Sequence, residues 1–250
     1  MSAGWIAIAG LGPGSDAMVT PQVREAIAQA SDVIGYIPYV ARIAPREGLT
    51  LHPSDNRVEI DRAVHALTLA AAGRRVVVVS SGDPGVFAMA AALFEALESG
   101  PPAWHDLRID VLPGITAMLA ASARAGAPLG HDFCAINLSD NLKPWGLIER
   151  RVRLAVEADF AIAFYNPRSK ARAEGFAAIL RLLRGICGDE RPMLFARAVS
   201  TPDEHLQVVP LSQATPDMAD MRTMVIVGSS TTRIIARAAG PILYTPRSAA

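Results

Sequence analysis

The sequence is poor in cysteine and has no net charge, and each of these deficits excludes a class of protein. The two cysteines among 250 residues, Cys134 and Cys187, lie too far apart to indicate a disulfide framework or a metal knuckle. Lys plus Arg and Asp plus Glu both number 24, which disfavours a general nucleic-acid binder. No apolar run reaches the roughly 18–20 residues of a membrane span, and the first residues lack a signal-peptide pattern. These absences favour a protein of the reducing cytoplasm, with no nucleic-acid or membrane partner.

Apolar residues make up 51% of the chain and charged residues 19%, which excludes disorder and provides for a sizeable core. Apolar runs that end in glycine, proline or polar residues alternate with amphipathic stretches, which predicts an α/β fold. In the first half, strands are expected over 5–9, 32–36, 75–80 and 107–112. Helices are expected over 21–30, 57–72, 86–98 and 116–125. The valine run Val76–Val79 indicates a central parallel strand covered on both faces.

A turn-rich segment at 126–131 predicts a boundary between two α/β domains, 1–128 and 129–250. In the second half, strands are expected over 133–138, 159–165, 193–198, 207–210 and 223–227. Helices are expected over 144–156 and 170–184. A polar turn precedes the strand at 207–210, which indicates an antiparallel pair. We therefore expect a mostly parallel N-terminal sheet and a mixed C-terminal sheet.

A glycine-rich loop, Gly10–Gly14, follows the first strand and admits three interpretations. It is a tight turn without a ligand, a dinucleotide site of a dehydrogenase, or a site for another ligand. Ser15 stands where a dinucleotide fingerprint has its third glycine, Pro13 removes an amide, and no acid ends the strand at 32–36. These departures disfavour the dehydrogenase.

Two further loops follow strands in the first half, and the first of them is Ser80–Phe87. Its Asp83 is placed either to bind a ligand amine, a ribose or a substrate proton, or to cap the next helix. The other loop is Leu112–Ala117, in which Thr116 is either a helix cap or a ligand contact. Because parallel strands end at one edge, the three loops together favour a ligand site there.

Gly10–Gly14, Gly82–Pro84 and Pro113–Thr116 stand in an order and spacing that resemble the tetrapyrrole methyltransferases that use S-adenosylmethionine. The resemblance continues over nearly the whole chain through Asn137–Asp140, Phe164–Ser169 and Thr223–Thr232. Together with Gly35–Val40, the last two segments are most similar to the branch that methylates precorrin-3B at C17 and contracts the macrocycle in cobalamin biosynthesis. Methylation at another precorrin position, C11 or C20, stays open.

The resemblance implies a two-domain fold with the active site in the interdomain cleft, a homodimer, and S-adenosylmethionine that leaves as S-adenosylhomocysteine. It implies cofactor contacts at Gly12, Pro13, Ser81, Gly82, Asp83, Val86, Thr116, Ala117, Asn166, Ala198 and Met224. The family usually has Gly-Gly-Asp in the second loop, so Ser81 adds a hydroxyl there.

A precorrin carries several carboxylates, and the segment 143–172 has seven basic residues against three acidic ones. Arg168 and Lys170 follow a strand and are the expected carboxylate ligands, together with Tyr36 as a substrate contact. The basic residues Arg150, Arg151 and Arg153 fit a solvated helix face better than a site.

Ring contraction needs proton transfers, for which Asp83 or the pair Ser139 and Asp140 are the expected acid–base groups. Methyl transfer from a sulfonium needs no metal. The five histidines lack metal-site spacing, so they are expected to be surface or capping residues.

Overall fold

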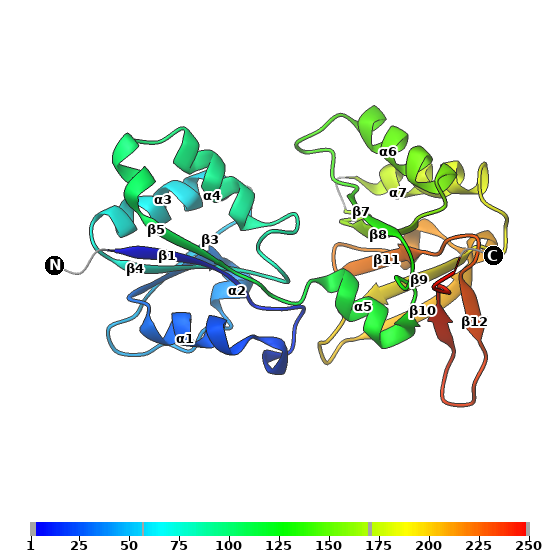
Figure 1. Ribbon diagram of the computed structural model, residues 1–250, viewed down its shortest axis with the longest axis horizontal. Coiled ribbons are helices and arrows are strands. Elements are labelled where there is room, and N and C mark those ends of the chain that lie inside the picture. The colour runs from blue at the N-terminus through cyan, green and yellow to red at the C-terminus, as the bar shows by residue number, and fades with distance from the viewer. Residues whose placement is uncertain (1–3, 57, 170–171, 249–250) are drawn as a thin grey trace. The chain divides into compact units, whose positions relative to one another are not determined.

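The computed structural model describes residues 4–56, 58–169 and 172–248, which fold as two compact units (Figure 1). Unit 1 is Met1–Thr116 and unit 2 is Ala117–Ala250. The boundary between the units follows Thr116, whereas the sequence predicted it after residue 128. The reason is that the helix following Thr116 packs on the sheet of unit 2, and Gly126–Ala127 pairs with a strand near the C-terminus.

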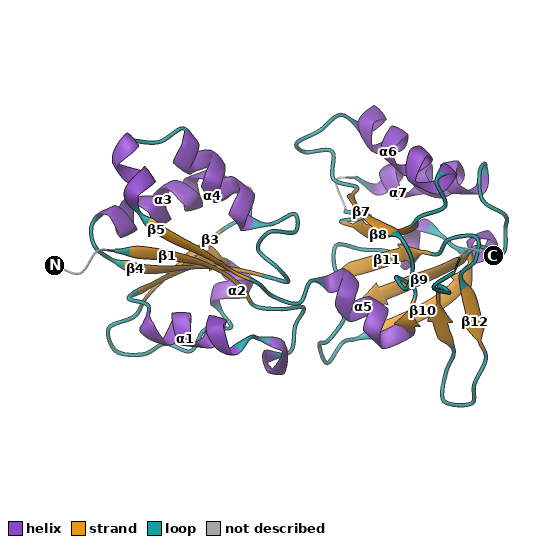
Figure 2. Ribbon diagram, viewed as in Figure 1, coloured by secondary structure: helices purple, strands orange, loops and turns teal. Residues whose placement is uncertain are grey.

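Unit 1 is a five-stranded parallel sheet with the order β3-β2-β4-β1-β5. The strands are β1 Trp5–Gly10, β2 Asp32–Tyr36, β3 Thr50–Ser54, β4 Arg75–Ser80 and β5 Arg108–Leu112. The helices are α1 Pro21–Gln29, α2 Ile37–Val40, α3 Glu59–Ala71 and α4 Met89–Glu98, with short 3-10 turns at Asp16–Met18 and Pro102–Asp106. Figure 2 shows α3 and α4 on one face of the sheet and α1 on the other. The valines of β4 alternate between these two layers and are fully buried, which confirms the predicted central strand.

Two elements of unit 1 differ from the expectation. The edge strand β3 contains His52 and Pro53 and shows no apolar run, so its pairing with β2 was not predicted. Helix α4 begins at Met89, later than predicted, because Phe87 has a φ of 53° and Ala88 is extended.

Unit 2 is a mixed five-stranded sheet with the order β10-β9-β11-β8-β7, joined by a small sheet with the order β12-β13-β6. Only β7 and β8 of the large sheet pair in parallel, and β10 is antiparallel to β9 as expected. The strands are β6 Gly126–Ala127, β7 Phe133–Asn137, β8 Ala161–Tyr165, β9 Pro192–Arg197, β10 His205–Pro210, β11 Thr223–Val227, β12 Arg233–Ile235 and β13 Ile242–Tyr244.

The sheet of unit 2 is also covered on both faces. Helices α6 (Trp145–Glu157) and α7 (Ala173–Arg184) bury one apolar layer, and α5 (Ala117–Ala125) covers the other. Short 3-10 turns lie at Leu211–Gln213 and Pro216–Met218. In the described part of the chain, none of the helices has the length and apolar character that crossing a membrane requires.

The segment Gly228–Thr232 forms hydrogen bonds that hold parts of unit 2 together. The backbone N–H of Ser230 donates to Asp159 Oδ1 at 2.7 Å, and Arg191 donates to the same oxygen at 3.1 Å. Burial raises the pKa of Asp159, but the hydrogen bonds from Ser230 and Arg191 outweigh it and lower that pKa overall. Thr232 contacts the Thr245 hydroxyl at 2.8 Å, so this segment holds the last strand in place.

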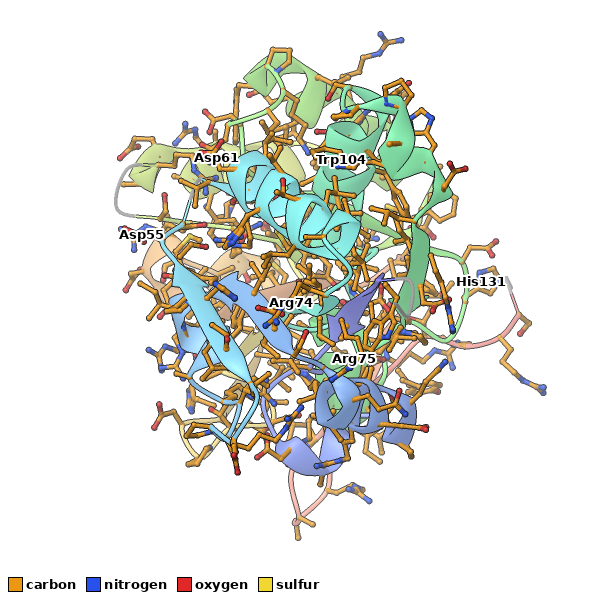
Figure 3. All side chains as sticks on the ribbon, turned by 90° about the vertical axis from the view of Figure 1, so that its left-hand side faces the viewer. Asp55, Asp61, Arg74, Arg75, Trp104 and His131 are labelled. Atoms are coloured by element: carbon orange, nitrogen blue, oxygen red, sulfur yellow. The ribbon has the colours of Figure 1, made fainter. Side chains whose placement is uncertain are left out.

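Asp32, at the start of β2, is a buried acid of unit 1 with three hydrogen-bonding partners. Its carboxylate is 2% exposed and accepts hydrogen bonds from Arg74 Nε at 2.7 Å and from Ser31 Oγ at 2.7 Å, while His52 Nε2 lies 2.9 Å away (Arg74 is labelled in Figure 3). Burial raises the pKa of Asp32, but the bonds from Arg74, His52 and Ser31 outweigh it and hold that pKa below the ordinary value of an aspartate.

Asp32→Asn is therefore expected to lower the free energy of unfolding by about 2–3 kcal/mol at neutral pH, since a charged acceptor is lost. Because the folded state favours the carboxylate, its contribution is present above the unfolded pKa and is lost as the pH falls through the folded pKa. Urea unfolding should show the variant and the parent converging as the pH falls below about 4. The control is Asp61→Asn at an exposed position of α3 (Figure 3), and a pH-independent difference for Asp32→Asn would contradict the linkage.

Candidate functional site

The three glycine-containing loops of unit 1 meet at one edge of its sheet. They follow β1, β4 and β5, which are adjacent and parallel, so all three leave from carboxyl ends. Gly12 and Gly82 exchange two backbone hydrogen bonds, of 2.8 and 3.2 Å, which join the first loop to the second. Both residues have positive φ, 68° and 64°. This confirms the prediction that the three loops of unit 1 lie at one edge of the sheet.

Glycine is required at positions 10 and 114 because the first and third loops pack closely against the backbone of the second loop. A Cβ on Gly114 would lie 2.1 Å from the carbonyl oxygen of Gly82, and a Cβ on Gly10 would lie 2.6 Å from the same oxygen. Real side chains do not approach a backbone oxygen this closely, so these positions exclude any other residue. The first loop is therefore more than an isolated tight turn.

Asp83 connects the second loop to the third. Its Oδ1 accepts the backbone N–H of Gly85 at 2.8 Å, and its Oδ2 accepts that of Gly114 at 3.0 Å. The alternative in which Asp83 caps the next helix is wrong, because α4 begins at Met89 and its N-cap residue, Ala88, makes no side-chain cap. The carboxylate instead holds the second and third loops together. Each of its oxygens has a second lone pair that can accept a hydrogen bond from a ligand.

The edge presents both polar and apolar groups, as binding sites for small molecules commonly do. Phe87 and Ile115 expose 49% and 38% of their surface in the second and third loops, beside the half-buried Ser81 and Asp83. The predicted cofactor residues that lie on these loops of unit 1 are Gly12, Pro13, Ser81, Gly82, Asp83, Val86 and Thr116.

In unit 2, several predicted residues share one edge of the large sheet. Asn137 ends β7, Asn166 follows β8 and Ala198 follows β9, while Met224 lies at the start of the antiparallel β11. Asn166 Nδ2 donates to Asn137 Oδ1 at 3.1 Å. Asn166 and Ala198 have φ values of 50° and 49°, although neither is glycine. Met224 is 4% exposed and packs in the layer under α5, the helix that Ala117 begins.

The predicted acid–base pair of unit 2 lies in the loop after β7. The N–H of Ser139 donates to Asn137 Oδ1 at 2.9 Å, and Asp140 lies 3.6 Å from Arg172 Nε. A pocket of about 510 Å³ is lined by Asp140, Arg172 and Trp145, among other residues. Arg168 follows β8, and its Nε is buried without a partner among residues 4–56, 58–169 and 172–248. Lys170 lies outside the described residues.

The end of β2 and the segment after it hold Tyr36, the predicted substrate contact, and also Arg42, to which the sequence patterns gave no role. The rings of Tyr36 and Tyr39 meet edge to face, with centroids 5.4 Å apart. Arg42 donates to the carbonyl of Leu11 at 3.0 Å and so holds the first loop. No local pattern marks Arg42, because its partner comes from another part of the chain.

Two expectations about exposure can be compared with the structure, that for the arginines of α6 and that for the histidines. Arg150, Arg151 and Arg153 are exposed on α6, which confirms the solvated face. His52 is wrongly predicted as a surface residue, because its side chain is only 22% exposed and bonds Asp32 inside unit 1. Within the part of the chain that the structure describes, no group of three His, Cys, Asp or Glu side chains could hold a metal ion.

Comparison with known proteins connects this chain to one family. The profile of the Tetrapyrrole (Corrin/Porphyrin) Methylases matches residues 6–215. A Precorrin-3B C(17)-methyltransferase from Sinorhizobium sp is 53% identical over 98% of this chain and 96% of its own length. The crystal structure of the methyltransferase CobJ superposes with a TM-score of 0.94 at 65% identity, covering 97% of this chain and all of that one. A uroporphyrin-III C-methyltransferase from Thermus thermophilus, solved with S-adenosylhomocysteine, shares the fold at 20% identity and a TM-score of 0.68, covering 90% of this chain and 97% of that one.

Proposed function

The chain belongs to the tetrapyrrole (corrin/porphyrin) methylases, and we propose that it methylates precorrin-3B at C17 with ring contraction to precorrin-4 in cobalamin biosynthesis. The observation that carries this proposal is the 53% identity to a C17-methyltransferase over nearly the full length of both chains. The loop edge of unit 1 supports it, because its polar and apolar groups suit an adenosyl ligand. The dehydrogenase is not proposed, since the Gly10–Gly14 loop belongs to this family pattern.

We assign the cofactor contacts of unit 1 to Gly12, Pro13, Ser81, Gly82, Asp83, Val86 and Thr116. Asn166, Ala198, Met224 and Ala117 are the proposed contacts of unit 2. When bound, S-adenosylmethionine would supply an electrophilic methyl group on a sulfonium. The loops would restrain the reacting partners, and such orientation contributes up to roughly 7–11 kcal/mol to catalysis.

The substrate carries carboxylates, for which Arg168 and Lys170 are the proposed ligands, with Tyr36 as a further contact. Arg168 fits this role because its buried Nε has no hydrogen-bond acceptor among the described residues.

Asp83, Ser139 and Asp140 are the proposed acid–base groups of the contraction. We further propose that the protein is a homodimer. We also propose a cytoplasmic location, which is consistent with the two free cysteines.

Calorimetry with S-adenosylhomocysteine is the first test, with NAD as the control ligand. We expect micromolar binding of S-adenosylhomocysteine, which needs no labile macrocycle, and no heat from NAD. Binding of NAD alone would overturn the proposal and restore the dehydrogenase interpretation. The second step is a mass and absorbance assay with precorrin-3B, in which a methylated but uncontracted product at C11 or C20 would contradict C17 chemistry.

A further inference from the structure

A cavity of about 300 Å³ in unit 1 lies beside the edge strand β3 and the first two turns of α3. Its lining includes His52, Ser54, Asp61, Arg62 and His65 (Asp61 is labelled in Figure 3). Of the described residues that line it, none belongs to the three glycine-containing loops. All but Asp61 can donate a hydrogen bond, and the proposed function uses none of these donors.

Arg62 is a buried cation without a carboxylate partner. It is 5% exposed, and it donates from Nε to Ser54 Oγ at 2.8 Å, from Nη2 to the carbonyl of Asp55 at 2.7 Å and from Nη1 to Met89 Sδ at 3.2 Å. A hydroxyl, a carbonyl and a thioether carry no charge, and Arg62 forms no ion pair among residues 4–56, 58–169 and 172–248. Because buried charges are ordinarily paired, this guanidinium lacks an anion.

Arg62 and His65 also retain unused donors. A guanidinium has five N–H groups, so the bonds through Nε, Nη1 and Nη2 leave one further N–H on each Nη. The ring of His65 meets that of His52 edge to face, with centroids 4.9 Å apart, and forms no hydrogen bond within the described part of the chain. Burial, followed by His52, lowers the pKa of His65, so its ring is neutral at neutral pH and donates through one N–H.

The acids near the cavity do not supply the missing negative charge. Glu59 and Asp61, in the first turn of α3, are exposed, where solvent screens their charges. Burial lowers the pKa of Arg62, and the more distant Glu59 raises it only in part. Asp32 is already paired with Arg74 at 2.7 Å. The guanidinium therefore keeps a positive charge that no neighbouring carboxylate balances.

We propose that this cavity binds a small oxyanion, a phosphate or a carboxylate, between the free Nη N–H groups of Arg62 and the imidazole of His65. A planar guanidinium matches either oxyanion. The N-cap residue of α3, Val58, makes no side-chain cap, so the backbone N–H groups of the first turn add a favourable field for an anion. A cavity of this size admits a free phosphate or one carboxylate arm of a larger molecule. The inference does not rest on the proposed function.

Inorganic phosphate is the probe, and the Hε1 resonances of the five histidines report where it binds. The titration is made at neutral pH, with the ionic strength held constant by potassium chloride. We expect saturable shifts at His52 and His65 with a millimolar dissociation constant, and no shift at His105, His131 and His205, which lie outside the cavity. Equal shifts at all five would show an adventitious ion only, and either that result or no shift at all would overturn the site.

Two exposed lining residues provide variants that leave the core intact. His65→Ala removes one donor and should weaken phosphate about 5-fold, followed at His52, whereas Asp61→Asn removes a like charge and should tighten phosphate about 2-fold. Asp110→Asn on β5 is the matched control and should bind like the parent. Arg62→Gln should weaken phosphate about 10-fold or more, with circular dichroism as the check of folding. Parent affinity in both His65→Ala and Asp61→Asn would show that Arg62 only braces β3 and α4, which would overturn the site.

Kinetics with precorrin-3B then identify the source of the oxyanion. Competitive inhibition by phosphate that weakens about 5-fold in His65→Ala would identify a carboxylate arm of the tetrapyrrole, and an unchanged KM would identify a free oxyanion. The phosphate titration needs neither cofactor nor macrocycle. A protein that binds phosphate here but not S-adenosylhomocysteine would keep this site and lose the proposed function, and the opposite result would do the reverse.

Discussion

Replacing Gly114 by alanine is expected to destabilise unit 1 by about 3 kcal/mol or more, the largest stability effect that we predict for a single methyl group. The new Cβ would lie 2.1 Å from the oxygen of Gly82 and 2.8 Å from that of Gly10, and backbone atoms cannot move aside as a flexible side chain does. The loops must then separate, which also breaks the bond from Gly114 to Asp83. Binding of S-adenosylhomocysteine should weaken together with stability.

Urea unfolding followed by tryptophan fluorescence measures this effect, because Trp5 and Trp104 both lie in unit 1. Gly146→Ala is the matched control, since this helical glycine in α6 has nothing within 4 Å of an added Cβ. It should raise the free energy of unfolding by about 0.5–1 kcal/mol. A Gly114→Ala protein as stable as the parent would show that the loops are not packed as described.

Asp83→Asn is expected to lower kcat/KM for methyl transfer about 100-fold while the protein still folds, a loss of about 2.7 kcal/mol in transition-state stabilisation. Asparagine can still accept one of the two backbone N–H groups, but its amide then presents a donor toward the other. The edge loses its negative charge and one of its links between loops. Turnover of precorrin-3B by mass analysis and the far-UV circular dichroism spectrum should be measured on the same preparation.

Asp110→Asn on β5 is the matched control, because its carboxylate is 44% exposed and pairs with Arg108 at the surface. It should keep the turnover of the parent. Wild-type turnover in Asp83→Asn would remove Asp83 from the reaction and leave Ser139 and Asp140 as the candidate acid–base groups.

The alternation of sheet and helix layers in both units could be predicted because apolar runs and helix-start residues that are close in sequence determine it. The valines of β4 had to lie in a doubly covered strand, and Thr20 followed by Pro21 marked the start of α1, where Thr20 Oγ1 accepts the N–H of Val23. The glycine and proline loops could be placed at one edge because parallel strands end together. These expectations needed no knowledge of distant contacts.

The remaining features depend on partners far away in the sequence. β3 forms only because β2 accepts it as an edge strand, although Pro53 lies within it. His52 could not be recognised as partly buried without knowing that Asp32 bonds it from the neighbouring strand. In the site, the residues of the loops were predicted, whereas Arg42 was not, because its role depends on the carbonyl of Leu11, which comes from a distant part of the chain.

The hydroxyl of Thr245 donates to the carbonyl of Pro128, a contact that spans 117 positions in the chain. On the ribosome, unit 2 therefore cannot complete its fold until the last strand has emerged, since β13 also pairs with β6 near the start of that unit. All strands and helices of unit 1 lie within the first 116 residues, so we expect it to fold while the rest is still being translated. The loop edge around Asp83 then exists before Asn166, Ala198 and Met224 have been synthesised.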